Sequence, residues 1–106
     1  MPQITLRLFR VIPSKDEDVE MELRKLGEII KTRSLMNNNV EYFTITKISG
    51  DDVKGAIVIK GDEIAIKNEA QLLITIVKSS FNTIDVEDQL SENPLIRVLS
   101  SFKHFF

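Results

Sequence analysis

The chain has 106 residues, of which 42% are hydrophobic and 28% are charged, and its formal net charge is −2. These values are typical of one globular domain and exclude a disordered or collagen-like chain. Because there is no cysteine, a disulfide scaffold, a cysteine-ligated metal site and thiol catalysis are also excluded. We expect residues 1–106 to form a single domain.

The sequence shows no sign of membrane insertion or secretion. No stretch approaches the roughly 18 consecutive apolar residues of a membrane-spanning helix. The N-terminal segment MPQITLRLFRVIP alternates apolar and polar residues, unlike the apolar stretch of a signal peptide. We therefore expect a cytoplasmic protein. Isoleucine occurs 14 times and alanine three times, within an Ile, Lys and Glu bias that both hyperthermophiles and AT-rich genomes produce.

The first two elements are a strand and a helix. Residues 3–12 alternate between apolar and polar side chains, which predicts a strand that ends at Pro13. Ser14 and Glu17 have the spacing of a capping box. The apolar stripe that follows predicts a helix over 15–34. Its members are Val19, Leu23, Leu26 and Ile30.

The middle of the chain predicts a three-stranded meander. Residues 40–48 and 53–60 are rich in β-branched and aromatic side chains and flank a turn at 49–52. A tight turn there places Ile48 opposite Val53. Gly61-Asp62 has the pattern of a two-residue hairpin loop, which predicts a returning strand over 63–67. That register places Ile57 opposite Ile66 and Ile59 opposite Ile64, all on one face.

The last third of the chain predicts helices. Asn68 and Gln71 form a second capping-box pattern before a helix over 69–81. A strand remains an alternative for 72–77 because of the β-branched run LLITIV. The remaining predicted elements are a helical turn over 84–90 and, after Asn93-Pro94, a helix over 94–104.

The predicted order is therefore β-α-β-β-β-α-α. Each helix has one apolar stripe to bury, so the helices must cover one face of the sheet. We predict an α+β, two-layer domain with a mainly antiparallel four-stranded sheet and the helices on one face.

Few residues are suited to catalysis or metal binding. The single histidine, His104, lies close to the C-terminus, where chains are usually poorly ordered. The acidic pairs Asp51-Asp52 and Asp62-Glu63 lie in predicted turns at opposite ends of the meander, so they cannot converge on one ion. The four glycines do not have the spacing of a phosphate-binding loop. We expect no enzyme activity, no cofactor, no metal and no small-molecule ligand.

Two apolar surfaces indicate contacts between proteins. Aromatic residues crowd the C-terminus, and a second group projects from the sheet face opposite the predicted core. Exposed apolar clusters often mark protein contacts, and a two-fold dimer is the commonest way to bury one. The interface candidates are Phe102, Phe105, Phe106, Phe43, Ile45 and Val58. The first hypothesis is a non-catalytic interaction domain that forms a homodimer or docks on a protein partner.

The second hypothesis is single-stranded nucleic-acid binding on the outer sheet face. Basic residues interleave with aromatic ones there, and such surfaces stack bases and bind phosphates. The candidates are Arg7, Phe9, Phe43, Lys47, Lys54, Lys60 and Lys67. This hypothesis ranks second because the chain lacks the basic excess typical of nucleic-acid binders.

Overall fold

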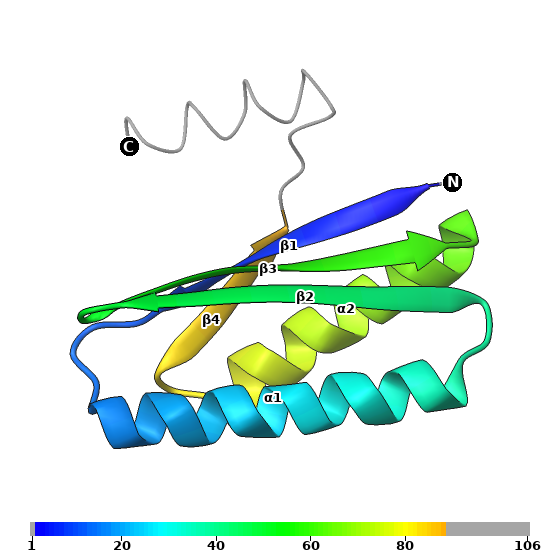
Figure 1. Ribbon diagram of the computed structural model, residues 1–106. Coiled ribbons are helices and arrows are strands. Elements are labelled where there is room, and N and C mark those ends of the chain that lie inside the picture. The colour runs from blue at the N-terminus through cyan, green and yellow to red at the C-terminus, as the bar shows by residue number, and fades with distance from the viewer. Residues whose placement is uncertain (1, 89–106) are drawn as a thin grey trace, which may run out of the picture.

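The computed structural model describes residues 2–88, which form a four-stranded antiparallel sheet with two helices on one face (Figure 1). The sheet order is β2-β3-β1-β4. The elements are β1 (Gln3–Arg10), α1 (Asp16–Met36), β2 (Val40–Ser49), β3 (Asp52–Gly61), α2 (Glu63–Ser80) and β4 (Ile84–Asp88). The predicted α+β, two-layer class is therefore confirmed, although the order is β-α-β-β-α-β.

The first strand and helix are confirmed, but the predicted cap is wrong. Helix α1 begins after Lys15, and no side chain caps it. The hydroxyl of Ser14 instead accepts a hydrogen bond from Nε of Arg10 at 2.9 Å. The acidic first turn of α1 still suits the positive end of the helix dipole.

The β2–β3 hairpin forms in the predicted register. Ser49 pairs with Asp52 and Ile48 with Val53. Gly50 occupies the first position of the two-residue loop with φ of 59°, a conformation that glycine adopts without the steric cost of a Cβ. Val53 is buried, whereas 59% of Ile48 is exposed, because β2 lies at the edge of the sheet.

The predicted strand 63–67 is wrong, and so is the hairpin at Gly61-Asp62. Gly61 ends β3, and residues 63–67 form the start of α2, which Asp62 caps: its side chain accepts a hydrogen bond from the backbone N–H of Ala65 at 3.2 Å. The buried residues have helical spacing across both the predicted strand 63–67 and the predicted helix 69–81, and this longer pattern outweighs the short alternation of EIAIK. The buried apolar residues are Ile66, Ala70, Leu73 and Val77. Ile64, which the strand would have buried, is 72% exposed.

Two further corrections follow from the true start of α2. The Asn68/Gln71 capping box lies inside the helix, and residues 72–77 are helical. The helical turn predicted over 84–90 is also wrong, because Ile84–Asp88 form β4 beside β1. Ile84 and Val86 alternate with exposed or half-exposed acids, the period of a strand. The helix predicted over 94–104 lies outside the described residues.

The core lies between the sheet and the helices. Leu6, Ile57, Ile59 and Leu73 are fully buried there. Gly55 permits a close approach in the sheet, because a Cβ at this position would lie 2.7 Å from the carbonyl oxygen of Ile45. The helices thus cover one face of the sheet, and neither helix covers the opposite face (Figure 1).

Candidate interaction surface on the sheet

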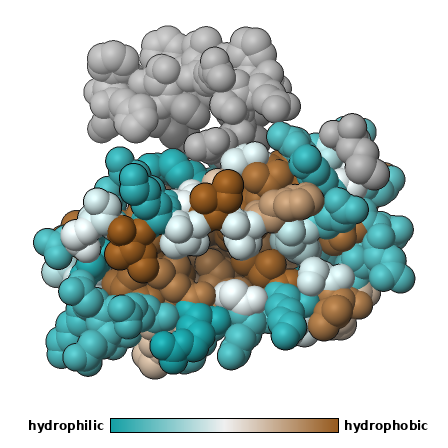
Figure 2. Space-filling view, viewed as in Figure 1, coloured by the Kyte–Doolittle hydropathy of each residue, from teal (hydrophilic) through white to brown (hydrophobic). Residues whose placement is uncertain are grey.

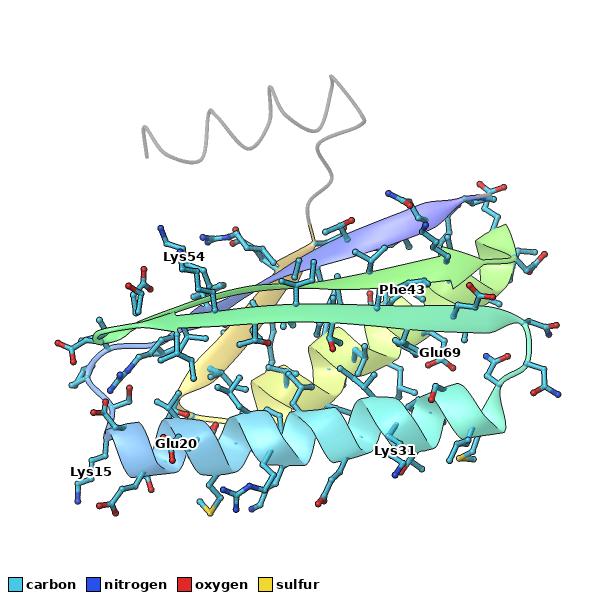
Figure 3. All side chains as sticks on the ribbon, viewed as in Figure 1. Lys15, Glu20, Lys31, Phe43, Lys54 and Glu69 are labelled. Atoms are coloured by element: carbon cyan, nitrogen blue, oxygen red, sulfur yellow. The ribbon has the colours of Figure 1, made fainter. Side chains whose placement is uncertain are left out.

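The outer face of the sheet brings together most of the predicted surface residues. The strand register places Phe43 directly beside Val58, and Ile45 beside Ala56. Phe43 is 49% exposed and Ile45 is 70% exposed. We call Phe43, Ile45 and Val58 the outer patch. Figure 3 labels Phe43 on this part of the sheet.

Charged side chains surround the outer patch. Glu41 pairs with Lys60 at one end, and Lys47 lies beside Lys54 at the other. Arg7 lies next to Ala56 on β1. The sheet alternation therefore produces an apolar centre with a charged rim, which is the usual anatomy of a protein interface.

Several of the basic groups already have partners within the chain. Nε of Arg7 lies 2.7 Å from the carboxylate of Glu87, and its guanidinium lies 4.7 Å from the ring centre of Phe9. The ammonium of Lys60 lies 5.3 Å from the ring centre of Phe43. These contacts occupy rings that a nucleic-acid platform would use for stacking.

Not all of the predicted residues lie on this face. Lys67 is on α2, where its ammonium lies 3.3 Å from the carboxylate of Glu63, so its assignment to the sheet is wrong. Its placement followed from the strand predicted over 63–67. Phe102, Phe105 and Phe106 lie outside the described residues.

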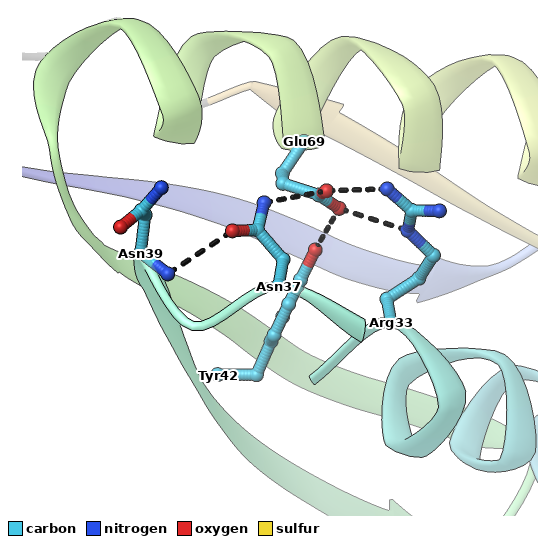
Figure 4. A network of polar contacts seen from close by, with 5 residues as sticks. All are labelled: Arg33, Asn37, Asn39, Tyr42 and Glu69. Carbon is cyan, nitrogen blue, oxygen red and sulfur yellow. Dashed lines mark hydrogen bonds and ion pairs between the residues drawn. The ribbon is translucent and has the colours of Figure 1, made fainter. Parts of the chain in front are cut away.

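A buried carboxylate lies between α1, α2 and β2 and was not predicted from the sequence (Figure 4). Glu69 is 4% exposed. Arg33 donates to both of its oxygens, at 2.5 and 3.2 Å. Asn37 donates to Oε1 at 3.2 Å, and the hydroxyl of Tyr42 donates to Oε2. No short motif indicates this cluster, because its members are separated along the chain and come together only in the folded protein.

The polar partners of Glu69 favour its ionised form. The hydrogen bond from Arg33 is the largest influence and lowers the pKa of Glu69 to about 2, with further lowering from Tyr42 and Asn37. Burial raises the pKa of Tyr42, and its hydrogen bond to Glu69 adds to this effect. Four donated hydrogen bonds saturate the carboxylate, so the cluster joins three elements rather than offering a free base.

A second buried carboxylate anchors the connection between α2 and β4. Oε1 of Glu22 accepts from the backbone N–H groups of Asn82 and Thr83, at 2.7 and 3.0 Å. Glu22 is 7% exposed. Its role is structural, since it satisfies two backbone donors that no strand or helix partner reaches.

Hollows occur at one end of the sheet and on the helix side. One, of about 650 Å³, is lined by Arg10 and the β1–α1 connection. The guanidinium of Arg10 donates hydrogen bonds to the carbonyl oxygens of Ser14 and Asp51 and to the carboxylate of Asp16. Another, of about 490 Å³, lies between the second half of α1 and the C-terminal end of α2, around Phe81. Within residues 2–88 no group of three potential metal ligands occurs, and neither helix is long and apolar enough to cross a membrane.

Solved structures match this chain, whereas no family model and no curated protein does. The de novo designed protein LFR1 1, a solution NMR structure with a ferredoxin fold, has a TM-score of 0.61 at 14% identity, covering 84% of this chain and 86% of that chain. The chain has the ferredoxin fold. The designed protein Ferredog-Diesel also matches, with a TM-score of 0.60 at 15% identity over 81% of this chain and 84% of that chain.

A third designed protein, Foldit4, has a TM-score of 0.52 at 21% identity, covering 83% of this chain and 97% of that chain. At these identities the likeness concerns the fold alone. The ferredoxin fold hosts many unrelated functions, and this chain lacks the cysteines that would hold an iron–sulfur cluster. Function must therefore be argued from the surface of this chain.

Proposed function

We propose that this ferredoxin-fold domain is a non-catalytic interaction module that associates with a second copy of itself through the outer patch. The observation that carries the proposal is the exposure of Phe43 and Ile45 side by side on β2, with Val58 adjacent. Large apolar side chains exposed together in this way are uncommon on the surface of a monomer.

The surroundings of the patch support the same interpretation. An aromatic side chain at the centre is the commonest kind of energetic anchor in an interface. The charges around it are of both signs, since Arg7, Lys47, Lys54 and Lys60 share the outer face with Glu41 and Glu87. In a two-fold contact the same surface of both copies meets, so basic groups of one copy can lie against acidic groups of the other. A rim that carries both signs of charge therefore suits a second copy better than it suits a polyanion.

The test is the mass of the protein in solution, measured by light scattering across a concentration series. We expect the wild-type chain to form a dimer and Ile45→Thr to weaken it, because threonine keeps the strand propensity and removes apolar contact area. Ile64→Thr is the matched control, since Ile64 is equally exposed but lies on α2. A wild-type chain that stays monomeric at all concentrations would refute self-association.

Single-stranded nucleic-acid binding is the second candidate. Its support is the shared outer face of Phe9, Phe43, Lys47 and Lys60. It predicts that an oligonucleotide raises the measured mass, that high salt reverses the increase, and that Lys47→Glu combined with Lys60→Glu abolishes it. An unchanged mass with oligonucleotide at low salt would remove this candidate.

A further inference from the structure

Strand β2 is a long, regular strand at the edge of the sheet. It has ten residues and pairs with β3 from Val40 to Ser49 with no skipped residue, so it has no bulge, and it contains no proline. Bulges, prolines and short length are the usual devices that prevent an edge strand from pairing with another chain. Hydrophobic residues gather along the side of the molecule that carries β2 (Figure 2).

The hairpin geometry determines which backbone groups face outward. In a two-residue hairpin the residues flanking the loop, here Ser49 and Asp52, form a hydrogen-bonded pair. Alternate residues of β2 therefore bond to β3, and the bond from the N–H of Asp62 to the carbonyl of Asn39 follows the same alternation. The N–H and C=O groups of the intervening residues, with Thr44 at their centre, point toward the free edge.

The opposite edge of the sheet differs in length and charge. Strand β4 has five residues, and three of them are the acids Asp85, Glu87 and Asp88. Asp85 is paired with Lys78 and Glu87 with Arg7, so the acids are partly neutralised, and the short length of this strand is what disfavours the addition of another chain. Of the two edges that the structure describes, β2 is the one suited to pairing.

The sequence of β2 is chemically self-complementary. When the segment V-E-Y-F-T-I-T-K-I is read from both ends toward Thr44, valine meets isoleucine, glutamate meets lysine, tyrosine meets threonine and phenylalanine meets isoleucine. We propose that a second copy adds its β2 antiparallel to this edge, with the two-fold axis at Thr44. This inference rests on the proposed function, and it names the partner and the register.

The backbone permits this register. It pairs Thr44 with the same residue of the second copy as a hydrogen-bonded pair, so each donates to the other through groups that face the free edge. Directly opposite residues share one face of a sheet. Glu41 then lies against Lys47 of the second copy twice, and Phe43 against Ile45 twice, all on the outer face. The outer patch thereby continues across the interface.

Neighbouring registers lose this complementarity. A two-fold axis at Phe43 would set Glu41 against Ile45, and an axis at Ile45 would set Phe43 against Lys47. In both cases the carboxylate and the ammonium lose their opposite charge, and one of the two apolar side chains, Ile45 in the first register and Phe43 in the second, meets a charged one instead. The proposed register also places Ile48, which is 59% exposed, against the buried Val40 at the margin of the core.

Charge reversal tests the register directly. Glu41→Lys alone sets lysine against lysine at both contacts, and Lys47→Glu alone sets glutamate against glutamate. We expect each variant to weaken the dimer about tenfold or more, since two attractive cross-strand pairs become repulsive. Mixing the two variants restores opposite charges at both contacts, so equal amounts should form a heterodimer of near wild-type affinity. The readout is solution mass by light scattering or sedimentation.

Two further variants separate the edge from the face. Lys54→Glu makes the same charge change on the outer face of β3, one strand away from the edge, and should leave the dimer intact. Thr44→Pro removes an N–H that points to the free edge, so the β2–β3 ladder should survive while strand addition is blocked. Circular dichroism checks that each variant is folded.

The outcomes distinguish the inference from the proposed function. Loss of dimer in both single variants, with recovery on mixing, establishes the register. A wild-type dimer that ignores both charge reversals, or that Lys54→Glu disrupts as strongly, refutes the edge contact and leaves self-association through the outer patch standing. A wild-type monomer refutes both.

Discussion

The buried carboxylate of Glu69 makes a quantitative prediction about stability and pH. Its hydrogen bonds, chiefly that from Arg33, lower its pKa from an ordinary value of 4.5 to about 2. One pKa unit corresponds to about 1.4 kcal/mol, so ionisation of this group contributes about 3 kcal/mol to the free energy of unfolding. We expect Glu69→Gln to remove about this much at pH 7, because the amide carries no charge for Arg33 to bind.

The sign of the pH dependence follows from the direction of the pKa change. Because the folded-state pKa lies below the unfolded-state value, the contribution is complete above about pH 4.5 and is lost as the pH falls toward 2. The difference in stability between wild type and Glu69→Gln should therefore shrink across this window.

The assay is urea denaturation of both proteins at pH 7, 4.5, 3 and 2, at concentrations where their assembly state is the same. Glu63→Gln on the same helix is the control. Its exposed pair with Lys67 should contribute about 0.5 kcal/mol or less. A difference between wild type and Glu69→Gln that stays constant from pH 7 to 2 would refute the assignment of the stabilisation to the ionised carboxylate.

Three other substitutions test the fold, each by the free energy of unfolding in urea. Gly27→Ala should stabilise the chain by about 0.5–1 kcal/mol, because a Cβ there meets nothing within 4 Å on α1; a loss of stability would contradict this. Gly61→Ala should prevent normal folding, since its φ is 147° and a Cβ would lie 2.1 Å from a backbone oxygen of the α1–β2 connection; a wild-type midpoint would contradict the geometry. Glu22→Ala should cost about 2–3 kcal/mol by leaving the N–H groups of Asn82 and Thr83 without their acceptor, and faster amide exchange at Thr83 would locate the effect.

The layers of the fold could be predicted from hydrophobic periodicity, whereas the strand order could not. Long elements such as α1 and the β2–β3 hairpin carry many repeats of one period, and their predictions were confirmed. The segment 63–67 has only two alternations, and the helical stripe that continues to Val77 determines its structure. The strand over 84–88 is equally short, and its burial depends on β1 lying beside it.

The same limit applies to the candidate surface. Alternation alone placed Phe43, Ile45 and Val58 on one face, as the register confirms. It could not place Glu69, because its donors come from α1, from the residue that follows α1 and from β2, and their contact with α2 depends on how the helices pack on the sheet.

The edge at β2 also follows from topology rather than from any local pattern. A meander that continued through 63–67 would have given β3 a different second neighbour. Because those residues begin α2, β3 pairs instead with β1, which in turn pairs with β4. Strand β2 is therefore the edge on the other side, and it carries both the exposed Phe43 and Ile45 and the outward backbone groups. A single strand addition would satisfy those backbone groups and extend the outer patch at the same time, which is why we expect the edge, and not the face alone, to determine the geometry of assembly.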